Sequence, residues 1–124
     1  MKKDIIILIA RSVWYYSQYD EDAFFGWLDK LKCVSKYDGK GDVLYIHIHT
    51  HAVDESALRE LLAVFHRYNI DMKQLTIFDR KEFALWFRSE KSYWFRSVFD
   101  VPPKTGRVAR RSRTAKGARA AIDP

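Results

Sequence analysis

The residues most capable of chemistry lie in one short run from His47 to His51, in which histidine alternates with other residues. Histidine nitrogens are common ligands of zinc and other transition metals, and residues two positions apart share one face of a strand. His47 and His49 could then reach one ion, with His51 or Asp54 as a third ligand and an open position at which water is activated. A metal-dependent hydrolase is therefore one hypothesis for the chain.

The same run is also typical of a polar outer strand face, on which Tyr45 would continue the stripe. The metallohydrolase pattern that begins with His-x-His needs an aspartate and a further histidine directly after it. In this chain Thr50, His51 and Ala52 follow instead. No Ser or Cys lies in a recognisable nucleophile elbow, and Cys33, at a strand start after Lys32, is expected to be a small buried residue. We therefore predict a noncatalytic protein that needs no cofactor and no resident metal.

Aromatic side chains are the second group of candidates, since the chain contains four Trp, seven Tyr and eight Phe. Trp14 and Tyr16 precede the first expected helix, Tyr45 lies on the polar strand face, and Trp94 belongs to the aromatic run 93–95. Three successive helical residues fan through about 200°, so one core cannot receive them all. Trp and Tyr are also frequent anchors of protein interfaces. We predict a protein-binding surface that uses these four residues, together with acidic residues near the first helix.

Charge is distributed unevenly along the chain. Lys and Arg total 22 against 16 Asp and Glu, but residues 101–124 hold seven of the basic residues and one of the acidic ones. The first hundred residues are therefore formally neutral. The basic residues of the terminal segment are Lys104, Arg107, Arg110, Arg111, Arg113, Lys116 and Arg119. They could bind phosphates without sequence preference, since no aromatic ring accompanies them to stack bases. A nucleic-acid-associated accessory protein is thus the alternative function, and a merely solubilising terminus is the other interpretation of this segment.

Length and composition favour one α+β domain over residues 1–100, followed by a basic and disordered tail over residues 101–124. The single cysteine, Cys33, excludes an intramolecular disulfide and fits a reducing compartment. The apolar run Ile5–Ala10 is too short to span a bilayer and too short for most signal peptides. We therefore expect a cytoplasmic protein.

Four segments have the character of strands. Residues 5–10 are apolar on both faces, which predicts a central strand that is covered on both sides. Residues 33–37 and 43–49 flank the glycine-containing loop 38–42 and predict a hairpin. A fourth strand is expected over residues 73–78.

Three aspartates mark expected helix starts, because each has apolar residues at the positions that form a hydrophobic staple. Asp20 begins a helix that runs to about Lys32, Asp54 begins one that spans residues 55–68, and Asp79 begins a third at residue 80. The three helices and four strands follow in the order β-α-β-β-α-β-α. This order predicts a ferredoxin-like sandwich with an extra C-terminal helix.

Two helix ends are also expected from the sequence. Asn69 tolerates the left-handed conformation, so the second helix should end there in a Schellman motif, with Ile70 folding back toward Phe65. The third helix should break near Ser89 into a second short helix that ends at Phe99.

The second half of the domain also carries a resemblance. The residues concerned are Leu58, Leu61, Leu62, Phe65, Arg67, Tyr68, Ile70, Asp71, Met72 and Leu75, followed by Trp86, Phe87, Tyr93, Trp94, Val98 and Phe99. This pattern resembles small bacterial proteins of unassigned activity, some of which look like immunity proteins of contact-dependent inhibition. The resemblance implies a cytoplasmic protein that blocks a toxin by occluding its active site. The neutral charge of the domain departs from the acidic face that immunity proteins of nucleases usually present.

Overall fold

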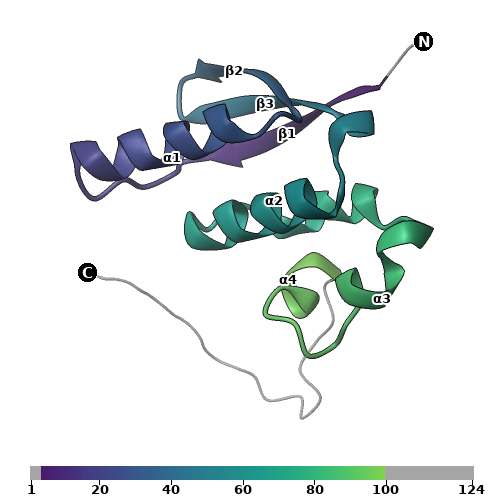
Figure 1. The fold of residues 1–124 in the computed structure, drawn as a ribbon. Helices are drawn as coiled ribbons and strands as arrows, with labels where there is room; N and C mark the ends of the chain where they lie inside the picture. Colours follow the sequence, from purple (N-terminus) through teal and green to yellow (C-terminus); the bar gives the residue numbers. More distant parts are fainter. Residues whose placement is uncertain (1–3, 100–124) are drawn as a thin grey trace.

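A computed structural model describes residues 4–99 of the chain. The basic segment 101–124, with its candidate nucleic-acid-binding residues, lies outside the described residues. The fold is α+β, as predicted (Figure 1). The elements, in chain order, are β1 (Ile5–Arg11), α1 (Gln18–Lys30), β2 (Val34–Lys40), β3 (Val43–His49), η1 (Thr50–Ala52), α2 (Glu55–Arg67), η2 (Met72–Phe78), η3 (Lys81–Phe83), α3 (Ala84–Phe87) and α4 (Phe95–Phe99), where η marks a 3₁₀ helix.

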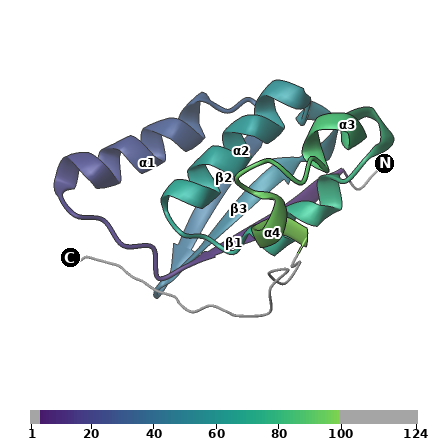
Figure 2. The same cartoon turned by 90° about the horizontal axis from the view of Figure 1, so that it is seen from below.

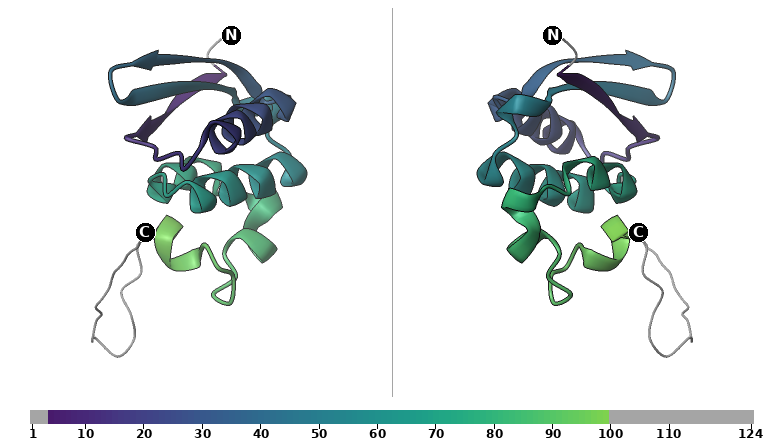
Figure 3. Two further views of the ribbon diagram at one scale, coloured as in Figure 1. Left: turned by 90° about the vertical axis from the view of Figure 1, so that its left-hand side faces the viewer. Right: turned by 90° about the vertical axis from the view of Figure 1, so that its right-hand side faces the viewer.

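The strands form one antiparallel sheet in the order β1-β3-β2. Helices α1 and α2 lie across the same face of this sheet (Figure 2). The opposite face carries no described helix, and α3 and α4 lie beyond α2, on its side away from the sheet (Figure 3). Alternation along the strands sends Leu8, Ile46 and Ile48 into the buried core between sheet and helices.

The prediction of a central first strand covered on both sides is wrong. Within residues 4–99, β1 is an edge strand that pairs only with β3. Leu8 and Ala10 are buried against the helices, but Ile5 and Ile7 are 41% and 49% exposed on the open face. The apolar pattern of β1 thus predicts cover on both faces, but among the described residues only the helices on the inner face cover it.

The predicted fourth strand is also wrong, because residues 72–78 form the 3₁₀ helix η2. Asp71 caps this helix by accepting a hydrogen bond from the backbone N–H of Lys73 at 3.0 Å. Met72, Leu75 and Phe78 are buried, and their spacing of three residues matches the 3₁₀ repeat. The described residues therefore contain three strands, and the ferredoxin-like order is not completed.

The second helix starts and stops as predicted, within one residue. The Asp54 carboxylate accepts a hydrogen bond from the N–H of Ala57 at 2.8 Å, which caps the helix. Asn69 has a φ of 59°, and the N–H of Ile70 donates to the carbonyl of Phe65 at 2.9 Å. Both features define the Schellman motif that the sequence predicts.

Asp20 and Asp79 are not the helix caps that the sequence predicts. Helix α1 begins earlier, at Gln18, and Ser17 caps it by accepting a hydrogen bond from the N–H of Asp20 at 3.2 Å. Asp79 closes η2 instead of opening the next helix, and its carboxylate accepts a hydrogen bond from Nε of Arg88 at 3.0 Å.

The third predicted helix is broken, as expected, and ends at Phe99. Its parts η3, α3 and α4 stay together because their apolar side chains share the core: Phe83, Phe87, Trp94 and Val98 are buried. The indole N–H of Trp94 donates to the Phe87 carbonyl at 2.8 Å, which joins the two sides of the break.

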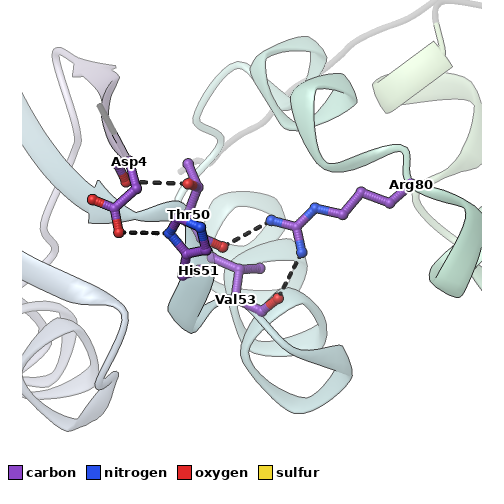
Figure 4. A network of polar contacts seen from close by, with 5 residues as sticks. All are labelled: Asp4, Thr50, His51, Val53 and Arg80. Carbon is purple, nitrogen blue, oxygen red and sulfur yellow. Dashed lines mark hydrogen bonds and ion pairs between the residues drawn. The ribbon is translucent and has the colours of Figure 1, made fainter. Parts of the chain in front are cut away.

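Arg80 attaches this helical part to the connection between β3 and α2 (Figure 4). Its guanidinium donates hydrogen bonds to the carbonyls of Thr50 at 2.8 Å and Val53 at 3.1 Å.

Within residues 4–99, no helix combines the length and apolar character that a bilayer span requires.

Candidate protein-binding surface

Three large aromatic side chains are exposed where β1 leads into α1. Trp14, Tyr16 and Tyr19 are 70%, 73% and 83% exposed, and we call them the aromatic patch. The rings of Trp14 and Tyr16 meet edge to face, with centroids 6.3 Å apart. Each offers a broad apolar surface with a polar group at one end, which suits contact with another protein.

The residue between the first two members of the patch points inward. Tyr15 packs its ring against Phe24 and Tyr68, with centroids 5.6 Å and 6.3 Å away. Burial raises the pKa of the Tyr15 phenol to about 12. Because the Tyr15 ring packs against the core, its neighbours Trp14 and Tyr16 are directed outward.

The start of the connection is fixed to the hairpin. The backbone N–H of Ser12 donates to the Asp42 carbonyl at 2.7 Å, and the Ser12 hydroxyl donates to the Asp42 carboxylate at 2.6 Å. The second of these bonds lowers the pKa of Asp42. Ser12 has a φ of 50°, an uncommon conformation for a non-glycine residue, and these two bonds hold it.

The end of the connection is fixed by Asp20. One oxygen of its carboxylate accepts a hydrogen bond from the N–H of Tyr16 at 2.8 Å, and the other accepts one from the Tyr68 hydroxyl at 3.0 Å. Burial, followed by this bond to Asp20, raises the pKa of Tyr68. Asp20 thus connects the backbone of the patch to helix α2 and acts as a positioning residue.

A hollow of about 370 Å³ opens beside the patch. The residues that line it are Trp14, Tyr16, Asp20, His66, Arg67 and Tyr68. Aromatic faces and charges of both signs therefore surround a space large enough for a side chain of a bound protein. An apolar centre with a polar rim is the usual construction of a protein interface.

The structure separates the four anchors that the sequence predicts. Trp14 and Tyr16 lie together, whereas Tyr45 is half-buried on the open sheet face, between Ile9 and Asp38 of the neighbouring strands. Trp94 is 6% exposed and belongs to the core, so it is not available as an anchor in this fold.

Tyr19 is exposed but is not one of the four predicted anchors. The sequence also places it in an apolar staple before Asp20, and that staple depends on a helix start three residues too late. The pattern Ser17-x-x-Asp20 carries the correct start, because a serine followed three residues later by an acidic residue is typical of a capping box.

The three candidate metal ligands do not converge. His47 lies on the open sheet face, with its Nε2 3.3 Å from the Asp38 carboxylate. His51 lies in η1, beyond the end of β3, and its Nδ1 is 2.8 Å from the Asp4 carboxylate (Figure 4). This bond lowers the pKa of Asp4. Among the residues that the structure describes, no three His, Cys, Asp or Glu side chains are grouped to hold a metal ion.

A larger hollow, of about 660 Å³, lies between the end of α1 and the start of α2. Cys33 is among its lining residues, but the residue is buried and burial raises the pKa of its thiol. A protonated thiol is a poor nucleophile. Across the hollow the indole N–H of Trp27 donates to Glu60 at 2.9 Å, which joins the two helices. Cys33 is thus the small buried residue that the sequence predicts.

Comparison with known proteins adds no relative to these observations: no family model, no curated protein and no solved structure matches the chain.

Proposed function

We propose that the chain is a noncatalytic protein-binding module and that the aromatic patch is its binding surface. One observation carries the proposal: Trp14, Tyr16 and Tyr19 are each at least 70% exposed within six residues of sequence. Exposing such rings to water is unfavourable, and a bound protein would cover them.

The way in which the patch is held also supports binding. Ordering a flexible side chain on binding costs about 0.5–1.5 kcal/mol, and surface loops commonly incur this cost. Here Ser12, Tyr15 and Asp20 fix the connection in the free protein. A preorganised aromatic surface loses less entropy when a partner binds, so more of the contact energy becomes affinity.

The more specific proposal is an immunity protein that covers the active site of a bacterial toxin. It is supported by the sequence resemblance and by a surface suited to contact and not to catalysis. The protein would act in the cytoplasm by occlusion, so it would inhibit at a ratio of one chain per toxin molecule. A toxin-domain gene immediately upstream of the coding sequence would identify the partner to test.

The binding proposal is tested by calorimetry with the purified toxin domain from that neighbouring gene. We expect the double variant W14A/Y16A to weaken binding by at least about 30-fold, which corresponds to about 2 kcal/mol, the usual threshold of an interface hot spot. Leu85→Ala is the matched control, since Leu85 is 95% exposed on α3, away from the patch. Unchanged binding by the double variant, or loss of binding by the control, would contradict the assignment of the surface.

A second candidate function is supported by the charge of the terminal segment. Seven basic residues and one acidic residue in residues 101–124 would give weak, salt-sensitive binding to DNA or RNA. We expect removal of residues 101–124 to abolish that binding and to leave protein binding by the aromatic patch intact. Nucleic-acid binding that survives the removal would exclude the segment as its source.

A further inference from the structure

The backbone of β1 has an edge that the described residues leave almost unoccupied. In an antiparallel pair, alternate residues direct both their N–H and their C=O toward the neighbouring strand, and the residues between them direct both away. Ile9 is turned away from β3, because its N–H donates to the side-chain oxygen of Gln74 at 2.6 Å and its carbonyl accepts from Gln74 Nε2 at 2.8 Å. Ile5 and Ile7 therefore present two N–H and two C=O groups at this edge.

Apolar side chains surround this edge. Ile5 and Ile7 are 41% and 49% exposed on the open face, and Ile6 is half-buried on the inner face. Residues three apart are eclipsed in a 3₁₀ helix, so Ile77 of η2 projects from the same side as Gln74 and is 54% exposed. The edge thus combines unpaired backbone groups with uncovered isoleucines.

The opposite edge of the sheet has a different character. Lys36, Asp38 and Lys40 are exposed along β2, and charged side chains on an edge strand oppose the addition of another strand. From Ile5 to Ile9 the β1 edge has no such protection. Gln74 caps one residue of it and leaves the rest open. The contrast between the two edges indicates that the β1 edge is used.

We propose that a second copy of the chain adds to the sheet through β1, so that two three-stranded sheets join into one of six strands. The two β1 strands run antiparallel about a two-fold axis at Ile6. In this register Ile5 and the partner's Ile7 form one hydrogen-bonded pair, and Ile7 and the partner's Ile5 form the other. Ile6 then lies directly opposite the partner's Ile6.

The residues of β1 favour a second copy over other occupants. The register uses the two open residues reciprocally and stops before Ile9, which Gln74 already occupies. Ile5 and Ile7 of both copies meet on the open face, and the two copies of Ile6 meet on the inner face. Each β1 strand therefore covers the exposed apolar side chains of the other. Asp4 lies opposite the partner's Leu8, so no like charges face each other. The segment 101–124 is a poorer occupant, since Val108 and Ile122 are its only large apolar residues apart from Val101.

The proposal is tested first by analytical ultracentrifugation of the full chain over a concentration series. We expect the mass to approach twice the 14.7 kDa of one chain as concentration rises. Ile7→Lys should raise the dissociation constant by about a hundredfold, because ammonium groups replace apolar contacts at the centre of the interface. Leu85→Lys, the same kind of change at an exposed site on α3, should leave the dimer intact. Far-UV circular dichroism checks that both variants fold.

A second variant tests the register. Cα atoms of a directly opposed pair that is not hydrogen-bonded lie about 4.5 Å apart, which is within disulfide range. Ile6→Cys should therefore form an intermolecular disulfide under mild oxidation, whereas Ile5→Cys should not, because its opposite residue is the partner's Ile7. The native Cys33 is fully buried and should not interfere. A wild-type chain that stays monomeric throughout the series, or a dimer that Ile7→Lys leaves unchanged, would overturn the proposal.

Discussion

At the residue scale, Asp20 shows how one side chain combines local and long-range roles. It lies in the first turn of α1, where a carboxylate is favourable, and there it accepts hydrogen bonds from Tyr16 N–H and Tyr68 O–H. An acceptor near this helix start could be predicted from the sequence. The bond to Tyr68 could not, because it joins positions 48 residues apart and depends on how α2 packs.

Replacing this acceptor tests its role in holding the aromatic patch. Asp20→Asn replaces one acceptor oxygen with an NH₂ group, so the Tyr16 N–H or the Tyr68 hydroxyl loses its acceptor. We expect the free energy of unfolding to fall by about 1–2 kcal/mol in urea denaturation. Asp22→Asn is the control, since Asp22 is exposed and accepts a hydrogen bond from the Gln18 side chain, and it should change stability by less than about 0.5 kcal/mol. Equal effects of the two substitutions would remove Asp20 from its positioning role.

The partly buried phenol of Tyr15 predicts how the fold responds to alkali. Its pKa is about 12 in the folded protein against 10.0 for an unperturbed tyrosine, so folding favours the neutral form. This contribution is complete below pH 10 and is lost as the pH rises through about 12. We expect Tyr15→Phe to lose less stability than wild type over this interval, as measured by thermal unfolding at a series of pH values. The pKa values of Tyr37, Tyr68 and Tyr93 are also raised, so both proteins lose some stability, and parallel curves would contradict the assignment to Tyr15.

At the scale of elements, the sequence predicts a helix or strand correctly where nearby residues in the chain determine its structure. The hairpin of β2 and β3 and the Schellman end of α2 depend on local turn residues, and the sequence predicts both, although the hairpin turn is Gly41 and Asp42 and not the longer loop 38–42. The strand predicted over residues 73–78 is wrong, because Leu75 and Ile77 alternate like strand residues over too short a segment to distinguish a strand from a helix. Met72, Leu75 and Phe78 recur every three residues, which is the 3₁₀ period, and Asp71 is a suitable cap. The three-residue spacing and the cap can be recognised in the sequence. The hydrogen bonds of Gln74 to β1 cannot.

Gln74 is expected to be the main polar link between η2 and the sheet. Gln74→Ala removes two hydrogen bonds to the backbone of Ile9. The part-buried N–H and carbonyl of Ile9 then lack the Gln74 side chain as a partner. We expect a loss of about 1–3 kcal/mol in the free energy of unfolding, measured by urea denaturation. Gln18→Ala is the matched control, because the Gln18 amide bonds to the exposed Asp22 carboxylate, and it should be nearly neutral. A similar loss in both variants would show that the cap on Ile9 contributes little.

At the scale of the whole molecule, the α+β class could be predicted from the sequence, but the attachment of the C-terminal helices could not. The apolar residues of these helices predict that they are buried, but they do not indicate which element they pack against. The structure shows that η2 contacts both α2 and α4, that α4 lies beneath α2 in Figure 1, and that Arg80 joins this helical part to the β3–α2 connection. A long-range hydrogen bond from a side chain to a backbone carbonyl has no sequence signature, which explains why Arg80 was not singled out.

Arg80 therefore tests whether the helical part and the sheet unfold as one unit. Arg80→Met keeps an unbranched stem over Phe83 but removes both donors, so the carbonyls of Thr50 and Val53 lose their partners. We expect a loss of about 1–3 kcal/mol with a single calorimetric transition, because the buried residues of both parts belong to one core. Lys81→Met, the same exchange of a cation at the exposed neighbouring position, should change stability little. Two separate transitions in Arg80→Met would mean that this side chain, and not the shared apolar core, couples the helices to the sheet.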